Sequence, residues 1–93
     1  KRHKYFKKNN KNKFDNYEAL NNIGVAYTKL NIDDKSLIYY DLALKIKHDY
    51  IDAHYNKALL LTKLNKLEES LGSYNKTIEL DKTHYGALKN RAN

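Results

Sequence analysis

Internal repetition is the feature of this sequence that most constrains its fold. The stretch 39–53 (YYDLALKIKHDYIDA) aligns with 73–87 (SYNKTIELDKTHYGA), and the offset between them defines the period of the sequence. The tetrapeptide TKLN recurs unchanged at 28–31 and 62–65, and the pattern begins again at 85–93. A fixed period of about 34 residues is typical of arrays in which each supersecondary unit buries its apolar face against its neighbours. We therefore expect a stack of similar units.

Each unit carries two runs of apolar residues at helical spacing. In the first unit the first run has i, i+3, i+7 and i+10 spacing and the second has i, i+3 and i+7 spacing, so each run forms one helical face. The residues are Leu20, Ile23, Tyr27 and Leu30, then Leu37, Tyr40 and Leu44, and in the second unit Leu61, Leu64, Leu71, Tyr74 and Ile78. We predict a helix–turn–helix in each unit.

The residues at the expected helix ends agree with this interpretation. Asn31 and Asn65 follow the first helix of each unit, where a left-handed residue is needed and Asn can replace Gly. Two aspartates before a first helix are each followed by an acid three residues later, which resembles a capping box. The candidate N-caps, in chain order, are Asp15, Asp33 or Asp34, Asp49 and Thr83.

Gly24 lies inside a predicted helix, where Gly costs about 1 kcal/mol relative to Ala. The residues one and two periods later are Ala58 and Ala92, so the same site is small in every unit. The second helices have small positions of their own at Ser36, Ala43, Ser70 and Thr77. Small residues let two helices approach closely. We predict a close helix–helix contact at Gly24 and its equivalents.

These residues resemble the tetratricopeptide repeat family, whose unit is a helix–turn–helix of about 34 residues with small and aromatic residues at fixed positions. The matching residues are Gly24, Tyr27, Ser36, Tyr40 and Ala43 in the first unit and Ala58, Ser70, Tyr74 and Thr77 in the second. The departures are Lys57, Leu61 in place of an aromatic, and no proline in the last turn. The resemblance implies an all-α fold, an α-solenoid of antiparallel helix pairs in a right-handed superhelix with about 2.5 repeats.

The expected organisation is a single repeat domain spanning 1–93. Arrays of this kind usually need at least three units and expose apolar surface at uncapped ends. We therefore expect a longer array or self-association through 5–16 or 85–93. The segments are 1–16, a degenerate helix and basic segment from a preceding repeat; 17–50, the first repeat; 51–84, the second; and 85–93, the start of a third.

Composition and motif spacing argue against catalysis. The chain has no cysteine, and its four histidines show neither the i, i+4 metal-ligand spacing nor an HExxH motif. No apolar run is long enough to span a membrane, so no membrane partner is expected. We predict a protein that is not an enzyme, with no catalytic residue, metal site or cofactor. The absence of cysteine suits a reducing compartment, and we expect a cytoplasmic location, with the nucleus as the alternative.

The family resemblance implies that the first helices line a concave groove. One column of that groove is Asn22, Asn56 and Asn90, at position 6 of successive repeats. An Asn amide offers one acceptor and two donors, so it can pair with both the N–H and the C=O of a peptide. This column resembles the asparagine ladder of peptide-binding members of the family. The other expected lining residues include Asn21, Val25, Thr28, Lys29, Tyr55, Leu59, Thr62 and Lys63.

The same positions argue against a related mode of binding. Members that hold the acidic C-terminus of chaperones use a two-carboxylate clamp, and of its five positions only Asn56 fits here. We therefore predict a protein-interaction scaffold that binds an extended peptide in the groove without that clamp. The contacts expected are Asn22, Asn56 and Asn90 to the peptide backbone, with Asn21, Tyr55, Lys29 and Lys63 also lining the site.

Two alternatives use other features of the chain. The repeats could instead serve as spacers or as an oligomerisation segment of a larger protein. The net charge of +7 also belongs entirely to residues 1–13, which hold seven Lys/Arg and no acid. Such a run can contact nucleic acid phosphates. We do not expect nucleic acid as the main partner, because residues 14–93 are neutral overall and continue no basic face.

Overall fold

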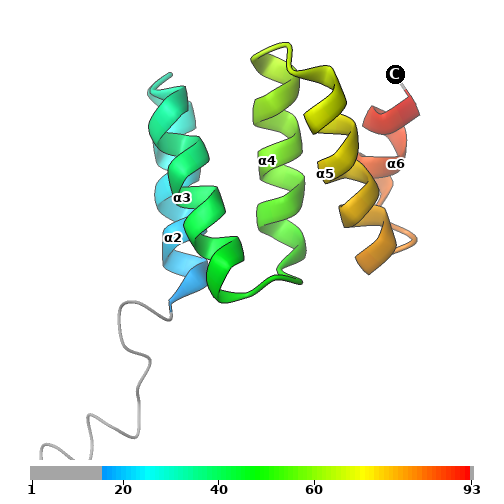
Figure 1. Ribbon diagram of the computed structural model, residues 1–93, viewed down its shortest axis with the longest axis horizontal. Coiled ribbons are helices and arrows are strands. Elements are labelled where there is room, and N and C mark those ends of the chain that lie inside the picture. The colour runs from blue at the N-terminus through cyan, green and yellow to red at the C-terminus, as the bar shows by residue number, and fades with distance from the viewer. Residues whose placement is uncertain (1–15, 93) are drawn as a thin grey trace, which may run out of the picture.

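The computed structural model describes residues 16–92, which form five α-helices and no strand (Figure 1). The prediction of an all-α fold is confirmed. The first and third helices start one period apart and have equal lengths, as do the second and fourth. The helices are α2 (Tyr17–Lys29), α3 (Asp33–Ile46), α4 (Ile51–Lys63), α5 (Leu67–Leu80) and α6 (Tyr85–Ala92).

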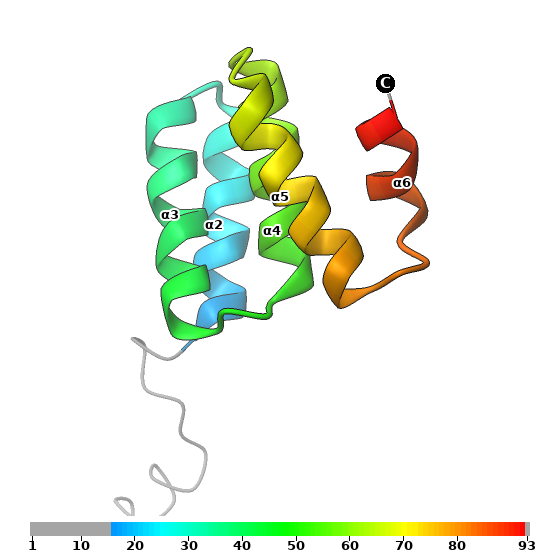
Figure 2. The ribbon, with the colours of Figure 1, turned by 45° about the vertical axis from the view of Figure 1, so that its right-hand side comes forward.

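The helices stack as antiparallel pairs. Helix α2 packs along α3 and α4 packs along α5, each pair joined by a short turn (Figure 2). The pairs contact each other through α3 against α4, and α6 continues the stack against α5. Helix α2 also touches α4, so the first helices of the two pairs lie on the same side of the stack. This arrangement is the predicted α-solenoid.

The turns inside the two pairs have the predicted left-handed asparagines. Asn31 has φ 62° and Asn65 has φ 63°. The N–H of Ile32 donates to the carbonyl of Tyr27 at 2.9 Å, and the N–H of Asn31 donates to the carbonyl of Thr28 at 2.9 Å. These two bonds are the Schellman pattern, which satisfies carbonyls that the end of a helix leaves open. The same pattern recurs after α4, so both turns reverse the chain in the same way.

The predicted N-caps are wrong where the structure describes them. Helix α4 follows Tyr50 and α3 follows Ile32, and neither residue makes a side-chain capping bond. Asp33 and Asp34 lie inside the first turn of α3, where their charge favours the positive end of the helix dipole. Asp49 forms an ion pair with Lys47 at 3.0 Å instead. The predicted cap Asp15 lies outside the described residues.

Two other residues cap helices by their side chains. The amide oxygen of Asn16 accepts from the N–H of Ala19 at 3.0 Å at the start of α2. His84 Nδ1 accepts from the N–H of Ala87 at 3.1 Å at the start of α6. The predicted cap Thr83 donates from its hydroxyl to Asp81. The ring nitrogen of His84 therefore acts as the capping acceptor, a role expected of a hydroxyl or carboxylate oxygen.

Small residues make the close contacts between helices. A Cβ on Gly24 would lie 2.6 Å from Cε1 of Tyr40 and 3.2 Å from the carbonyl oxygen of Ser36. Tyr40 is almost fully buried, so its ring would have to shift inside the packed core to make room for that atom. In the second pair, Ala58 is fully buried in a cluster with Tyr74. The close-contact prediction is confirmed at Gly24 and Ala58, whereas Ala92 is exposed, since no helix follows α6 within the described residues.

Candidate binding surface on the first helices

A recurring hydrogen bond links the first helices of successive repeats. The side-chain N–H of Asn56 on α4 donates to the amide oxygen of Asn21 on α2 at 3.1 Å. The side-chain N–H of Asn90 on α6 donates to the hydroxyl of Tyr55 on α4 at 3.3 Å. Both pairs are 35 residues apart, which joins position 5 of one repeat to position 6 of the next. The structure therefore brings four of the seven predicted site residues together in pairs.

Asn21 is a buried member of this network. Only 4% of its surface is exposed, and its amide oxygen accepts the hydrogen bond from Asn56. Burial raises the pKa of the Tyr50 phenol, and the nearby carboxylates of Asp52 and Glu18 raise it further. Asn21 is therefore nearly inaccessible, and its amide oxygen orients the amide of Asn56. Its predicted contact with a peptide stays a prediction.

Tyr55 holds Asn90 from a packed position. Its ring lies 4.6 Å from the ring of His84 and 6.2 Å from the ring of Tyr74, measured between centroids. On α6 the residue facing it is Gly86, where a Cβ would lie 2.5 Å from the Tyr55 hydroxyl oxygen. Any side chain at 86 would displace that hydroxyl. The glycine thus makes room for the bond between Tyr55 and Asn90.

The three asparagines at position 6 retain hydrogen-bonding capacity. Asn56 and Asn90 each use one side-chain N–H, which leaves the second N–H and the amide oxygen. Asn22 is exposed, and within residues 16–92 no hydrogen bond is found for its side chain. Asn56 and Asn90 therefore have fixed amides, and Asn22 has a free one.

A cavity of about 300 Å³ opens between α2 and α4 beside Asn56. Its apolar wall includes Val25 and Leu59, and 39% of the Leu59 surface is exposed. The full lining is Val25, Thr28, Lys29, Tyr40, Asn56, Leu59, Leu60 and Lys63. Three predicted site residues therefore line one cavity. Its volume is enough for one apolar side chain of a ligand.

The two lysines at equivalent positions differ in their surroundings. The Lys63 ammonium donates to the side-chain oxygens of Asn31 and Asp33, each at 3.0 Å, and so ties α4 to the turn of the first repeat. Lys29 is exposed and makes no ion pair among the residues that the structure describes. Lys29 is therefore the lysine of this cavity that is available to a ligand.

Two threonines expected in the groove bond to serines of the second helices, and Thr28 also lines the cavity between α2 and α4. The Thr28 hydroxyl bonds to the Ser36 hydroxyl at 2.8 Å and to the Tyr40 hydroxyl at 3.2 Å. Thr62 makes the equivalent bond to Ser70. Burial raises the pKa of Tyr40, and the bond from Thr28 partly opposes that rise. The threonine hydroxyls thus hold each helix pair together, and the family resemblance alone did not predict this.

The described residues show no sign of two other kinds of site. No helix between residues 16 and 92 is long and apolar enough to cross a bilayer. In the same part of the chain, no group of three His, Asp or Glu residues could hold a metal ion. The basic run at 1–13, the basis of the nucleic-acid alternative, lies outside the described residues.

The stacked helix pairs and the polar column on the first helices define a helical-repeat scaffold. The family model for the tetratricopeptide repeat matches residues 17–50 and 51–84, so the chain belongs to the tetratricopeptide repeat family. Repeats of this family are generally protein–protein interaction modules, and the family is typically a non-catalytic scaffold. A search of curated proteins finds no match to the chain.

The sequence analysis named Asn21 and Tyr55 as site residues but missed that they pair with Asn56 and Asn90. Position 6 was identified because Asn22, Asn56 and Asn90 recur at the repeat period. The partner bonds join residues 35 apart, one position more than the period, so a comparison at the period alone does not reveal them. Pairing polar residues one position beyond the period would have found Asn21 with Asn56 and Tyr55 with Asn90.

Proposed function

We propose that this chain binds an extended peptide along its first helices and holds the peptide backbone through Asn56 and Asn90. The observation that carries the proposal is the hydrogen bond that fixes each of these amides from the preceding repeat. A fixed amide loses little conformational freedom when a ligand binds, so more of its hydrogen-bond energy contributes to affinity. Its remaining N–H and C=O match the C=O and N–H that one residue of an extended peptide points to the same side.

The spacing of the helices suits an extended ligand. Packed helices lie about 9 Å apart, and an extended chain advances about 3.3 Å per residue. Asparagines on α2, α4 and α6 would therefore meet a peptide group about every third residue. Asn22 supplies the first contact and Asn90 the last. Because the contacts are to the backbone, binding depends on peptide conformation more than on peptide sequence.

The cavity beside Asn56 is the part of the site that can select among peptide side chains. A peptide held by Asn56 can place an apolar side chain against Val25 and Leu59. The exposed Lys29 on the same wall favours an acidic group next to that side chain. We expect the preferred ligands to combine one apolar residue with a neighbouring acid.

The test is a binding screen against a random peptide library. Ligands selected on the wild-type chain are measured again with Asn56→Ala, Asn90→Ala and the triple variant that also carries Asn22→Ala. Each asparagine makes two proposed bonds at about 1 kcal/mol each, so a single variant should weaken binding by about tenfold or more. Equal affinity of the wild type and the triple variant would remove the proposal.

Two further variants separate positioning and folding from direct contact. Tyr55→Phe keeps the packed ring and removes only the hydroxyl that holds Asn90. We expect it to weaken binding less than Asn90→Ala. Asn75→Ala is the matched control. Asn75 lies on α5, away from the first helices, and this variant also removes one interhelical hydrogen bond, the one that Arg91 donates to Asn75. Its affinity should equal that of the wild type.

A further inference from the structure

The two fixed amides of the proposed peptide site have the same orientation. Asn56 and Asn90 each donate one side-chain N–H to a residue at position 5 of the preceding repeat, at 3.1 Å and 3.3 Å. In both amides this N–H therefore faces the preceding repeat, and the same hydrogen-bonding groups remain for a ligand. A peptide that binds both amides must present the same backbone groups, on the same side, at each of the two helices.

The separation of the two amides follows from the close approach of the first helices. Helix α2 touches α4, and on α6 a Cβ at Gly86 would lie 2.5 Å from the Tyr55 hydroxyl oxygen on α4. The axes of packed helices lie about 8 to 10 Å apart. Asn56 and Asn90 occupy the same position one repeat apart, so their amides are separated by about this distance.

A flat β-strand fits this separation poorly. Its backbone groups return to the same side at every second residue, and it rises about 3.4 Å per residue. Groups on one side are therefore about 7 Å or about 14 Å apart, while the residue at about 10 Å points its N–H and C=O to the opposite side. A β-strand that meets Asn56 in the right orientation therefore does not meet Asn90 in the same way.

A polyproline II helix fits both the distance and the orientation. This extended left-handed helix has three residues per turn and a rise of about 3.1 Å, so the same face returns after about 9 Å. It has no internal hydrogen bonds, so its N–H and C=O groups are open to the asparagine amides. Building on the peptide-binding function proposed above, we propose that the bound peptide has the polyproline II conformation and meets Asn56 and Asn90 through residues three apart.

This conformation defines the class of peptide that the site takes. Every third residue needs its N–H for an asparagine and so is not proline. The two residues between these contacts make no bond to Asn56 or Asn90, so proline is accepted there. The cavity of about 300 Å³ beside Asn56 fixes the register, because an apolar side chain placed against Val25 and Leu59 determines which residue of each three meets that amide.

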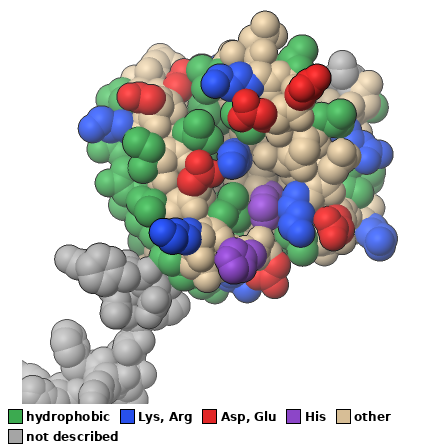
Figure 3. Space-filling view, viewed as in Figure 1, with side chains coloured by type: hydrophobic (Ala, Val, Ile, Leu, Met, Phe, Trp, Pro, Cys, Tyr) green, Lys and Arg blue, Asp and Glu red, His purple; other side chains and the backbone are tan. Residues whose placement is uncertain are grey.

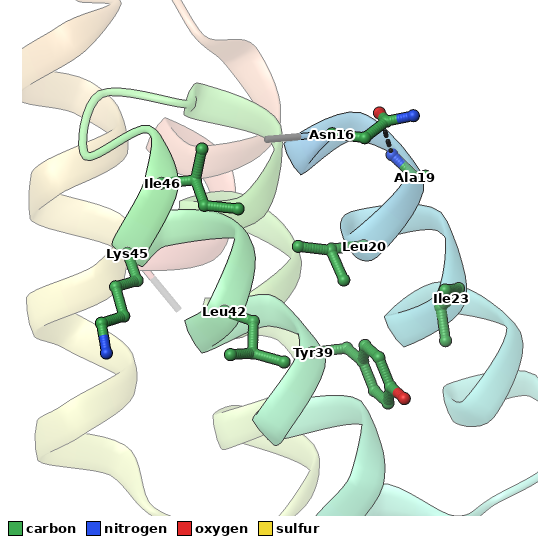
Figure 4. Close-up of a pocket in the computed structure, with 8 residues that line it drawn as sticks. All are labelled: Asn16, Ala19, Leu20, Ile23, Tyr39, Leu42, Lys45 and Ile46. Carbon is green, nitrogen blue, oxygen red and sulfur yellow. Dashed lines mark hydrogen bonds between the residues drawn. The ribbon is translucent and has the colours of Figure 1, made fainter. Parts of the chain in front are cut away.

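Two other hollows lie away from the asparagines. One has a volume of about 610 Å³ and is lined by side chains of α2 and α3 that include Leu20 and Leu42 (Figure 4). The other, of about 320 Å³, has charged residues of α4 and α5 in its lining, such as Lys57 and Glu69. The face on which α3 and α5 lie in front mixes side chains of both charges with hydrophobic ones (Figure 3). None of the three asparagines lines either hollow, so neither sets the register of the peptide.

The test measures how far apart the two contacts lie along a peptide selected on the chain. The peptide is N-methylated at one backbone nitrogen at a time, and isothermal titration compares the wild type with Asn56→Ala and Asn90→Ala. Methylation of a nitrogen that donates to an asparagine should weaken binding to the wild type by about fivefold or more, but should leave binding to the variant without that asparagine nearly unchanged.

The nitrogen coupled to Asn56 and the nitrogen coupled to Asn90 should be three residues apart. A separation of two or four residues would overturn the polyproline II conformation and leave the peptide-binding function standing. If no nitrogen were coupled to either asparagine, the peptide-binding function itself would fail, and this inference with it.

A proline scan of the same peptide gives a second measurement on the unmodified protein. Proline removes one N–H and fixes φ near the polyproline II value. At the coupled positions it should weaken binding by about fivefold or more, whereas at the two positions between them it should keep or raise the affinity, because it preorganises the peptide. N-methylalanine is the matched control, since it removes the same N–H without the ring. Losses that recur at every second residue, or at every residue, would contradict the polyproline II conformation.

Discussion

The two repeats share one backbone plan and differ in what surrounds each position. Their helices begin and end one period apart without an insertion. At the first small site, Gly24 meets the ring of Tyr40, whereas its equivalent Ala58 keeps a methyl group beside Tyr74. Leu20, Ile23 and Leu42 of the first repeat are replaced in the second by His54, Lys57 and Lys76. The repeat period therefore determines the backbone fold. Which side chain suits a given position depends on the residues that surround it in that repeat.

The largest effect is expected at position 11, where truncation of the side chain should destabilise the two repeats to different degrees. Leu61 is 1% exposed in the second repeat, so Leu61→Ala should cost about 3 kcal/mol of unfolding free energy. Its equivalent Tyr27 is half-buried and stacks on Tyr39 with ring centroids 5.6 Å apart. Tyr27→Ala should cost clearly less. Urea denaturation of both variants measures the difference, and equal losses would contradict it.

A smaller effect is expected from exchanging the small residues at position 8. Gly24→Ala places a methyl group against the buried Tyr40 ring, at a cost of about 2 kcal/mol from overpacking. Ala gains about 1 kcal/mol in helix propensity, so a net loss remains. Ala58→Gly loses about 1 kcal/mol by the same propensity. Both exchanges should therefore lower the urea midpoint, and a midpoint raised by Gly24→Ala would show that Tyr40 can move.

The smallest effect concerns pH and the residues at position 4. Burial lowers the pKa of His54 below 6.5, and nearby Lys57, Lys76 and His48 lower it further, against the hydrogen bond to the His48 carbonyl. The unfolded state then binds more protons than the folded state, so stability should fall as pH drops through about 6.5. His54→Leu introduces the first repeat's residue at this position.

Thermal unfolding between about pH 7.5 and pH 5.5 measures this dependence, because in that window the unfolded histidine changes its protonation. The aspartates with lowered pKa, Asp49 and Asp81, stay ionised there in both states and contribute little to the slope. The variant should show a weaker pH dependence than the wild type. If the variant had the same pH dependence as the wild type, the loss of stability at low pH would come from a group other than His54.

Much of the fold followed from the sequence because it rests on periodic information. The repeat period, the helix pairs, the left-handed Asn31 and Asn65, and the close contact at Gly24 were all predicted and confirmed. The caps were not, because capping depends on where the first turn begins to within one residue. Asn16 caps α2 where Asp15 was expected, and His84 caps α6 where Thr83 was expected.

The candidate site was predictable only as a column of residues. The sequence showed that Asn22, Asn56 and Asn90 share a position, but it could not show that Asn56 and Asn90 are held from the preceding helix while Asn22 is not. It also treated Lys29 and Lys63 as equal. The structure distinguishes them, because the turn of the first repeat offers Asp33 to Lys63. Such differences come from side-chain contacts between neighbouring repeats, and the spacing of residues along the sequence says little about those contacts.

The most direct test of the account uses a modified ligand and the unmodified protein. A peptide selected on the chain is resynthesised with N-methyl groups on alternate backbone nitrogens, which removes donors without changing any side chain. Isothermal titration then compares the two peptides. If Asn56 and Asn90 hold the peptide backbone about three residues apart, each register should remove one of the two donors and weaken binding by about fivefold or more. Unchanged affinity in both registers would contradict the account.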